Sequence, residues 1–81
     1  MRVTVRFFAR LKELAGTDTM TVEVTEPATV AMVWRAATVA APALVPFEHA
    51  LSCAINATFS KMSRPVSDGD DVAFLPPVSG G

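Results

Sequence analysis

The side chains of this 81-residue chain offer few groups that could catalyse a reaction. The one cysteine, Cys53, lies in an alternating apolar run, where a free cysteine behaves as a small buried apolar residue. The one histidine, His49, has no recognisable partner, so we expect it on the solvated surface. Ser79 has no evident general base to activate it. From the side chains we therefore predict no acid–base pair, no catalytic triad and no metal cluster.

The acidic segment 67–71, with the sequence Ser-Asp-Gly-Asp-Asp, could suggest a cation site. Its spacing is not that of a calcium loop, which needs further oxygen ligands and a distant glutamate. Aspartate followed by glycine is ordinary turn chemistry, because aspartate bonds nearby backbone and glycine supplies positive φ. We therefore interpret this segment as a turn.

The remaining candidate is the main-chain carboxylate of Gly81, at the end of the tail Pro76-Pro77-Val78-Ser79-Gly80-Gly81. The two prolines fix their own φ and offer no N–H, so strand pairing should stop there and the chain should leave the body stiff and extended. Six extended residues span at most roughly 20 Å, which is enough to enter another protein's cleft.

A carboxylate is ionised at neutral pH and can attack the α-phosphate of ATP to give an acyl-adenylate. A sulfur or nitrogen donor could then displace AMP. Glycine at positions 80 and 81 suits this reaction, because a chain without Cβ atoms can pass through a channel only a backbone wide. The tail is therefore predicted to be the reactive site.

Composition limits the other possibilities. The chain is 51% hydrophobic and 19% charged, which is typical of a folded domain. The net charge of −1 and the lack of a basic run argue against a nucleic-acid partner. The most apolar window, roughly 28–47, is interrupted by Arg35, Pro42 and Pro46, so no membrane span is expected. A single cysteine and no signal-like start favour a cytoplasmic protein.

The first half of the chain predicts two strands joined by a helical turn. In 2–8, Val3, Val5 and Phe7 share one face and should be buried, which leaves Phe8 on the outer face. A short helical turn over 9–15 ends at Gly16. Residues 19–25 alternate again and should pair with the first strand.

The second half predicts one main helix and a return to the sheet. The helix covers 30–41, with Thr29 as N-cap and Pro42 as the stop. Strands follow at 51–55, at 58–59 and at 72–75, the last two separated by a polar segment rich in turns. This order predicts an α+β fold of the β-grasp type, with a small mixed sheet on one helix and the last strand beside the first in its middle. Residues 1–75 would form the domain and 76–81 the tail.

Four segments resemble the small subunit of molybdopterin synthase, and the resemblance covers the full length. The segments are Phe7-Phe8-Ala9, Leu14-Ala15-Gly16-Thr17, Ser67-Asp68-Gly69-Asp70-Asp71-Val72-Ala73-Phe74 and the tail, which is the most specific of them.

The resemblance implies a ubiquitin-like sulfur carrier that is not catalytic alone. Gly81 would be adenylated by an activating enzyme that consumes ATP, and a sulfur donor protein would supply the sulfur of a thiocarboxylate. The tail, with the slender Gly80, would then enter the large subunit of a heterotetramer. There sulfur would pass to cyclic pyranopterin monophosphate in molybdenum cofactor biosynthesis. No cofactor would be bound by the chain itself.

The resemblance also implies a partner-binding surface. Phe8, Phe59 and Leu75 would form it next to the tail residues Pro76, Pro77, Val78 and Ser79. An exposed apolar patch on a small protein commonly marks an interface. One departure is Ala57, where relatives often carry a longer polar residue after the asparagine at position 56.

Other interpretations of the tail stay open. The chain could be a sulfur carrier for thiamine, cysteine or tRNA thiolation, a ubiquitin-like modifier joined to lysines, or an interaction module with an inert tail. The segment 76–79 favours the molybdopterin acceptor over the other sulfur acceptors. Sulfur transfer and protein conjugation both use a Gly-Gly carboxylate.

Overall fold

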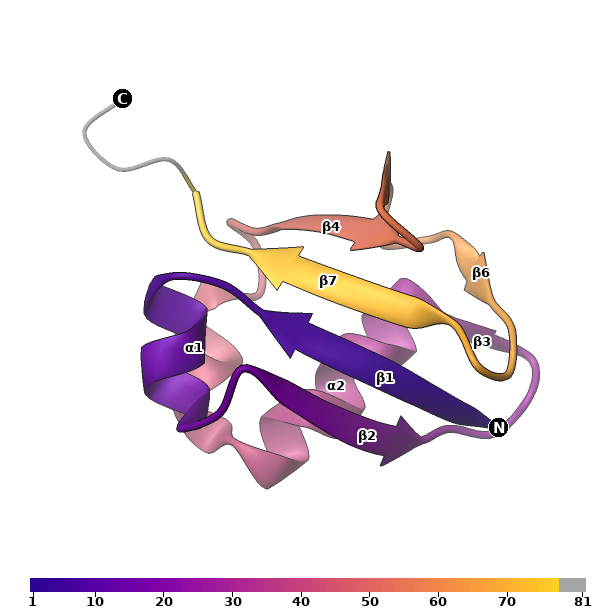
Figure 1. Ribbon diagram of the computed structural model, residues 1–81, viewed down its shortest axis with the longest axis horizontal. Coiled ribbons are helices and arrows are strands. Elements are labelled where there is room, and N and C mark those ends of the chain that lie inside the picture. The colour runs from indigo at the N-terminus through magenta and orange to yellow at the C-terminus, as the bar shows by residue number, and fades with distance from the viewer. Residues whose placement is uncertain (78–81) are drawn as a thin grey trace.

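The computed structural model describes residues 1–77 and contains two α-helices, one 3₁₀ helix and seven strands in that range (Figure 1). Their order along the chain is β1 Arg2–Phe7, α1 Arg10–Ala15, β2 Thr19–Glu23, β3 Ala28–Thr29, α2 Val30–Ala40, η1 Pro42–Phe47, β4 Ser52–Ile55, β5 Thr58–Ser60, β6 Pro65–Val66 and β7 Asp71–Leu75.

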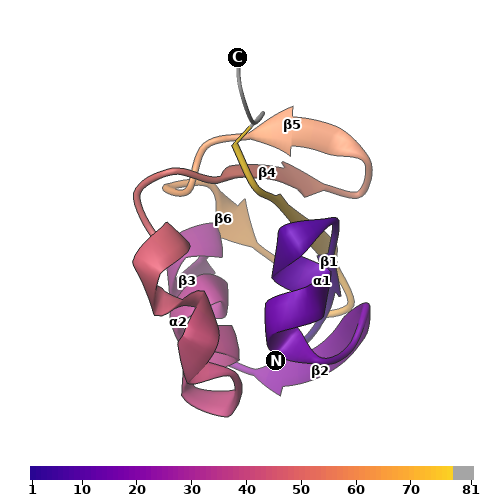
Figure 2. The same cartoon turned by 90° about the vertical axis from the view of Figure 1, so that its left-hand side faces the viewer.

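The main sheet has five strands in the order β2-β1-β7-β4-β5. The last strand, β7, lies at its centre, where it pairs parallel with β1 and antiparallel with β4. Helix α2 lies behind the sheet in Figure 1. Figure 2, which is turned by 90°, also shows α2 on one side of the sheet. The predicted β-grasp arrangement, with the first and last strands adjacent in the middle of the sheet, is confirmed.

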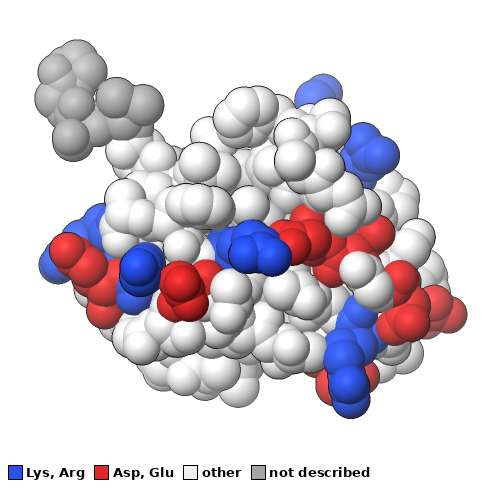
Figure 3. All heavy atoms as spheres, in the orientation of Figure 1, with Lys and Arg blue, Asp and Glu red and all other residues white. Residues whose placement is uncertain are grey.

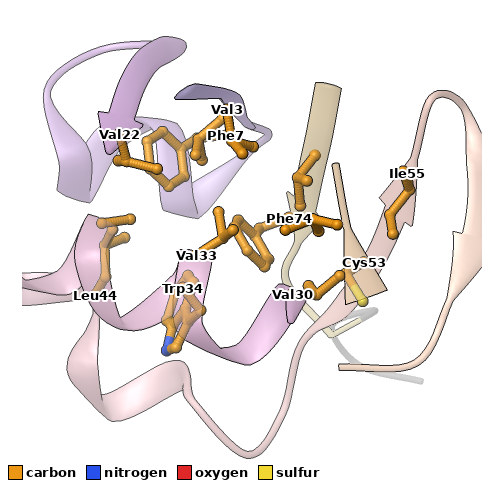
Figure 4. Close-up of a cluster of buried hydrophobic side chains, with 14 of the residues drawn as sticks. Val3, Phe7, Val22, Val30, Val33, Trp34, Leu44, Cys53, Ile55 and Phe74 are labelled. Atoms are coloured by element: carbon orange, nitrogen blue, oxygen red, sulfur yellow. The ribbon is translucent and has the colours of Figure 1, made fainter. Parts of the chain in front are cut away.

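The core lies between the inner face of the sheet and α2 (Figure 4). Alternate residues of β1 and β7 point inward, and the side chains of Val5, Phe7 and Phe74 are almost fully buried. The Trp34 ring from α2 meets Phe74 edge to face, with ring centroids 4.9 Å apart. Aromatic pairs in this geometry contribute beyond their buried area. β7 is therefore held by hydrogen bonds on both edges and by packing underneath.

Helix α1 forms the turn between β1 and β2 as predicted. Leu11 is fully buried. Gly16 ends the helix with φ 75°, and its N–H donates to the Lys12 carbonyl over 3.0 Å. Glycine takes this left-handed conformation without a Cβ penalty.

The start of α2 has the predicted N-cap residue, but other groups accept its first amides. Thr29 occupies the N-cap position, but its side chain makes no capping hydrogen bond. The first free amides of the helix, Val30 and Ala31, instead donate to the carbonyls of Arg64 and Met62 over 2.9 and 2.8 Å. The polar segment before β7 is therefore more ordered than its sequence predicted. It contains β6, which pairs with β3, and so brings main-chain acceptors to the helix end.

The turn between β4 and β5 holds the start of β7. Its two central residues, Asn56 and Ala57, have φ of 48° and 70°, as in a two-residue hairpin turn with positive φ at both positions. The Asn56 side-chain oxygen accepts the Asp71 amide over 3.0 Å, and its amide nitrogen donates to the Asp70 carboxylate over 3.2 Å. The Asn56 backbone N–H also donates to the Asp71 carbonyl over 2.8 Å. Asn56 thus ties the hairpin to the entry of the central strand.

The acidic segment is a turn, as interpreted from the sequence. Gly69 has φ 85°. The carboxylate of Asp70 accepts the Ser67 amide over 2.7 Å, and that of Asp68 accepts the Arg2 amide over 2.7 Å. These carboxylates bond backbone amides. Within residues 1–77, none of the helices combines the length and apolarity that crossing a bilayer requires.

The Asn56→Ala variant should be less stable than the wild type by about 1–2 kcal/mol. It loses two side-chain hydrogen bonds, and alanine is less tolerant of positive φ than asparagine. Urea unfolding followed by the fluorescence of Trp34, the one tryptophan, measures the change. Asn56→Gly is the control, because it loses the same bonds without the backbone penalty and should be the milder change. Equal stability of Asn56→Ala and wild type would disprove the role of this side chain.

The Ala57→Gly variant should be more stable by about 0.5–1 kcal/mol. Glycine relieves the left-handed strain of an L-residue, and this gain exceeds its greater loss of chain entropy. The same unfolding experiment measures it. Ala73→Gly, in the central strand without positive φ, should instead lower the free energy of unfolding. A loss of stability at both positions would contradict the strain at residue 57.

Candidate functional site

The base of the tail lies at the end of the central strand. β7 ends at Leu75, and the chain then leaves the sheet through Pro76 and Pro77. Leu75 is still paired with Ser52 of β4, so the last sheet residue is fixed by a neighbouring strand. The predicted site residues Val78, Ser79, Gly80 and Gly81 lie outside the described residues. The tail therefore starts from a rigid support.

Three of the predicted partner-binding residues, Phe8, Phe59 and Leu75, lie on the outer face of the sheet, opposite α2. Phe59 is 74% exposed and Phe8 is 46% exposed. Leu75 is partly buried at the end of β7. Strand alternation explains this placement, because the neighbours of Leu75 and Phe8, namely Phe74 and Phe7, are buried in the core.

Strand pairing extends this surface across three strands. Ala54 of β4 pairs with Ala73 of β7 on one side and with Phe59 of β5 on the other. Residues that pair directly share one face of a sheet, so these side chains lie in a row. We call the set Phe8, Ala54, Phe59, Ala73 and Leu75 the apolar face. Figure 3 views this side of the molecule and shows a broad uncharged area beside a band of charged side chains.

A surface ion pair borders the apolar face. The Arg6 Nε donates to an Asp71 carboxylate oxygen over 2.6 Å, and both side chains are partly exposed. The pair flanks a shallow depression of about 400 Å³, which is also lined by Phe8 and Ala73. Asn56 and Ala57 of the hairpin turn close its other side. The apolar face therefore combines a hollow for a partner's side chain with one fixed charge pair.

The position of Phe8 is set by a tight turn. Ala9 has φ 52° and ψ −126°, and the Leu11 amide donates to the Phe8 carbonyl over 3.1 Å. These angles are those of the first central residue of a type II′ turn, which normally prefers glycine. Such a conformation costs an L-residue on the order of 1–3 kcal/mol and is enriched at functional sites. The strained residue, Ala9, is therefore the direct neighbour of Phe8, whose ring is exposed on the outer face of the sheet.

The side-chain alternatives are placed as the sequence predicted. Cys53 is buried, and its thiol donates to the Ser60 carbonyl over 3.2 Å. His49 is 95% exposed. Across residues 1–77, no three His, Cys, Asp or Glu side chains lie close enough together to hold a metal ion. The described part of the chain thus provides a fixed base for the tail and an exposed apolar face beside it.

Sequence reasoning missed several members of this site. Ala54 and Ala73 follow from the alternation of their strands, but their small size gave no reason to select them. Arg6 and Asp71 are 65 residues apart, so only the parallel pairing of β1 with β7 shows that they meet. The hydrogen bonds of Asn56 to Asp71 also show that this residue supports the start of β7.

Comparisons with known proteins agree with this architecture. The family model described as "ThiS family" matches residues 5–81. The chain is 39% identical over 80 residues to the molybdopterin synthase sulfur carrier subunit of Escherichia coli (strain K12), a match that covers 98% of this chain and 99% of the relative.

Solved structures show the same fold. The crystal structure of SAMP1 from Haloferax volcanii has a TM-score of 0.87 at 30% identity, with 100% of both chains covered. A chain from the complex of subunits 1 and 2 of the molybdopterin-converting factor of Helicobacter pylori has a TM-score of 0.67 at 28% identity, also with 100% of both chains covered. Because the family model spans residues 5–81 and the E. coli relative is matched over nearly its whole length, this chain belongs to the ThiS family.

Proposed function

We propose that the chain is the sulfur carrier subunit of a molybdopterin synthase and that the carboxylate of Gly81 is its working group. The single observation that carries this proposal is the end of the central strand, where the chain leaves the sheet through Pro76 and Pro77 beside an apolar face. The names of the relatives at 39% and 31% identity favour the same role.

The proposed reaction begins in the active site of a partner, the activating enzyme. An activating enzyme presents ATP, and a carboxylate oxygen of Gly81 attacks its α-phosphate with release of pyrophosphate. A sulfide-level sulfur nucleophile from a donor protein then displaces AMP and leaves a thiocarboxylate. The carrier passes this sulfur to cyclic pyranopterin monophosphate in the large subunit, and water supplies the oxygen that restores the carboxylate. ATP is thus consumed by the partner, and the chain itself binds no cofactor.

The chain's own residues position this group. Pro76 and Pro77 restrict the backbone directly after β7, so less conformational freedom is lost when the tail enters a channel. Gly80 and Gly81 have no Cβ atoms, which allows an enzyme's groups to approach the terminal carbonyl carbon. Val78 and Ser79 connect the two prolines to the two glycines. We place all of this chemistry in the main chain.

We further propose that the apolar face binds the large subunit of a heterotetramer. Aromatic side chains dominate the affinity of protein interfaces, and Phe59 and Phe8 are the large exposed rings of this face. The Arg6–Asp71 pair at its border would fix the orientation of the partner rather than supply affinity. The same surface can serve the activating enzyme in turn.

One comparison favours a second candidate function. A structural neighbour with a TM-score of 0.85 and 28% identity is a small archaeal modifier protein 1 of Haloferax volcanii. A modifier would use the same adenylate, but the amine of a lysine would displace AMP. Carriers for thiamine, cysteine or tRNA thiolation share the sulfur chemistry and differ only in the acceptor.

Intact-mass spectrometry of the protein from its native cells should detect a fraction in which one terminal oxygen is replaced by sulfur. Deletion of Gly81 should abolish this species and molybdopterin formation, because the acyl group is then displaced by one residue. Gly80→Trp should do the same by blocking entry. Both variants should keep the wild-type free energy of unfolding, since the changes lie beyond the sheet. Retained molybdopterin formation by the deletion variant would refute the carrier role, whereas lysine-linked adducts would support a modifier.

Phe59→Asp should weaken binding to the large subunit at least about tenfold, because a charge replaces an aromatic contact. Titration calorimetry with purified large subunit measures this change. Val39→Asp is the matched control, since Val39 is 83% exposed on α2 at the other side of the sheet. Both changes lie at the surface, so each should alter the free energy of unfolding by at most about 0.5 kcal/mol. Equal affinity of the two variants would exclude the apolar face as the interface.

A further inference from the structure

The connection between β5 and β6 carries two cations on a fixed backbone. The Arg64 amide donates to the Lys61 carbonyl over 3.1 Å, which closes a tight turn. The carbonyls of Met62 and Arg64 accept the first amides of α2, so the turn is also tied to the end of the helix. The fold therefore sets the positions from which both basic side chains extend into solvent.

These two cations have no carboxylate partner in the described part of the chain. Lys61 and Arg64 are exposed and form no ion pair within residues 1–77, whereas three other arginines each pair with an aspartate or a glutamate. Residues 49–67 contain no acidic side chain. Figure 3 likewise shows basic side chains at the upper right of the view, apart from the band in which both signs alternate. The net charge of the chain is −1, so this positive charge is a local feature.

Both basic residues line a shallow hollow of about 400 Å³, together with Ser60, Ser63 and Pro65. We call these five residues the basic hollow. Its polar side chains can all donate hydrogen bonds, and none of them is a carboxylate. Glu26 lines a neighbouring hollow that shares Pro65, but it forms no ion pair with either cation. The basic hollow therefore offers donors and positive charge to a group from outside.

The basic hollow begins where the apolar face ends. Ser60, its first residue, directly follows Phe59, which is 74% exposed on the outer face of the sheet. β5 is an edge strand, so no further strand of the sheet lies beyond it. A partner that covers Phe59 can therefore extend past the edge of the sheet and meet Lys61 and Arg64.

We propose that the basic hollow receives an acidic segment of the large subunit, an inference that rests on the proposed sulfur carrier function. Aspartate or glutamate side chains of that segment would pair with Lys61 and Arg64, while Phe59 contacts apolar surface next to them. Exposed ion pairs add little to affinity, but complementary charges raise the rate of association and disfavour wrong orientations. The two cations thus guide the large subunit onto the apolar face.

The association rate constant tests this inference. Stopped-flow mixing of the carrier with purified large subunit at low ionic strength should show rates at least about threefold lower for Lys61→Glu and for Arg64→Glu. Arg35→Glu is the matched control, since it makes the same change of charge at an exposed position of α2 and should keep nearly the wild-type rate. At about 1 M salt the Debye length is only about 3 Å, so all rates should converge. Urea unfolding should show that the three surface variants are as stable as the wild type.

The possible failures are distinguishable. Equal rates for Arg64→Glu and Arg35→Glu, in a wild-type carrier that binds the large subunit, would overturn the role of the basic hollow and leave the carrier function intact. A lower rate that persists unchanged at high salt would also overturn it, because the effect would not be electrostatic. If the wild-type carrier does not bind the large subunit at all, the proposed function fails and this inference fails with it.

Discussion

The structure depends on the central position of β7. Its backbone is hydrogen-bonded to β1 on one edge and to β4 on the other, and Val72 and Phe74 are fully buried beneath it. A strand held in this way cannot detach without opening the core. Because the tail begins where this strand ends, its first residue, Pro76, follows directly on the centre of the sheet. A tail on an edge strand would lack this support.

The sheet is covered on one side only, and this creates two different surfaces. The inner face packs on α2 and closes the core, while the outer face leaves Phe8, Phe59 and Leu75 accessible next to the tail. The core therefore separates the outer face of the sheet from the solvent-exposed side of α2, where Val39 is 83% exposed.

Local patterns predicted much of this fold, whereas contacts between distant residues could not be predicted. Alternation in β1 and β7 identifies the buried residues and leaves Phe8 outside, and Gly16 ends α1 as its conformational freedom suggests. The short β3–β6 pair has no such pattern, since each strand has two residues. For that reason the carbonyls that accept the first amides of α2 could not be predicted, although Thr29 does occupy the predicted N-cap position. The shallow depression beside the apolar face likewise joins three separate segments that share no motif, around residues 6–8, 56–57 and 71–73.

The positive φ of Ala9 has a consequence for association. The turn fixes the backbone of Phe8 through the Leu11 hydrogen bond, so the direction of the aromatic side chain is restricted before any partner arrives. Ordering of side chains and loops at an interface usually costs affinity. Here the backbone part of that entropy is already lost when the domain folds, and the folded state bears the strain. The protein thus gives up some stability in the folded state and gains a surface that would lose little freedom on binding. Such a surface suits the proposed carrier role, in which two enzymes bind the same face in turn.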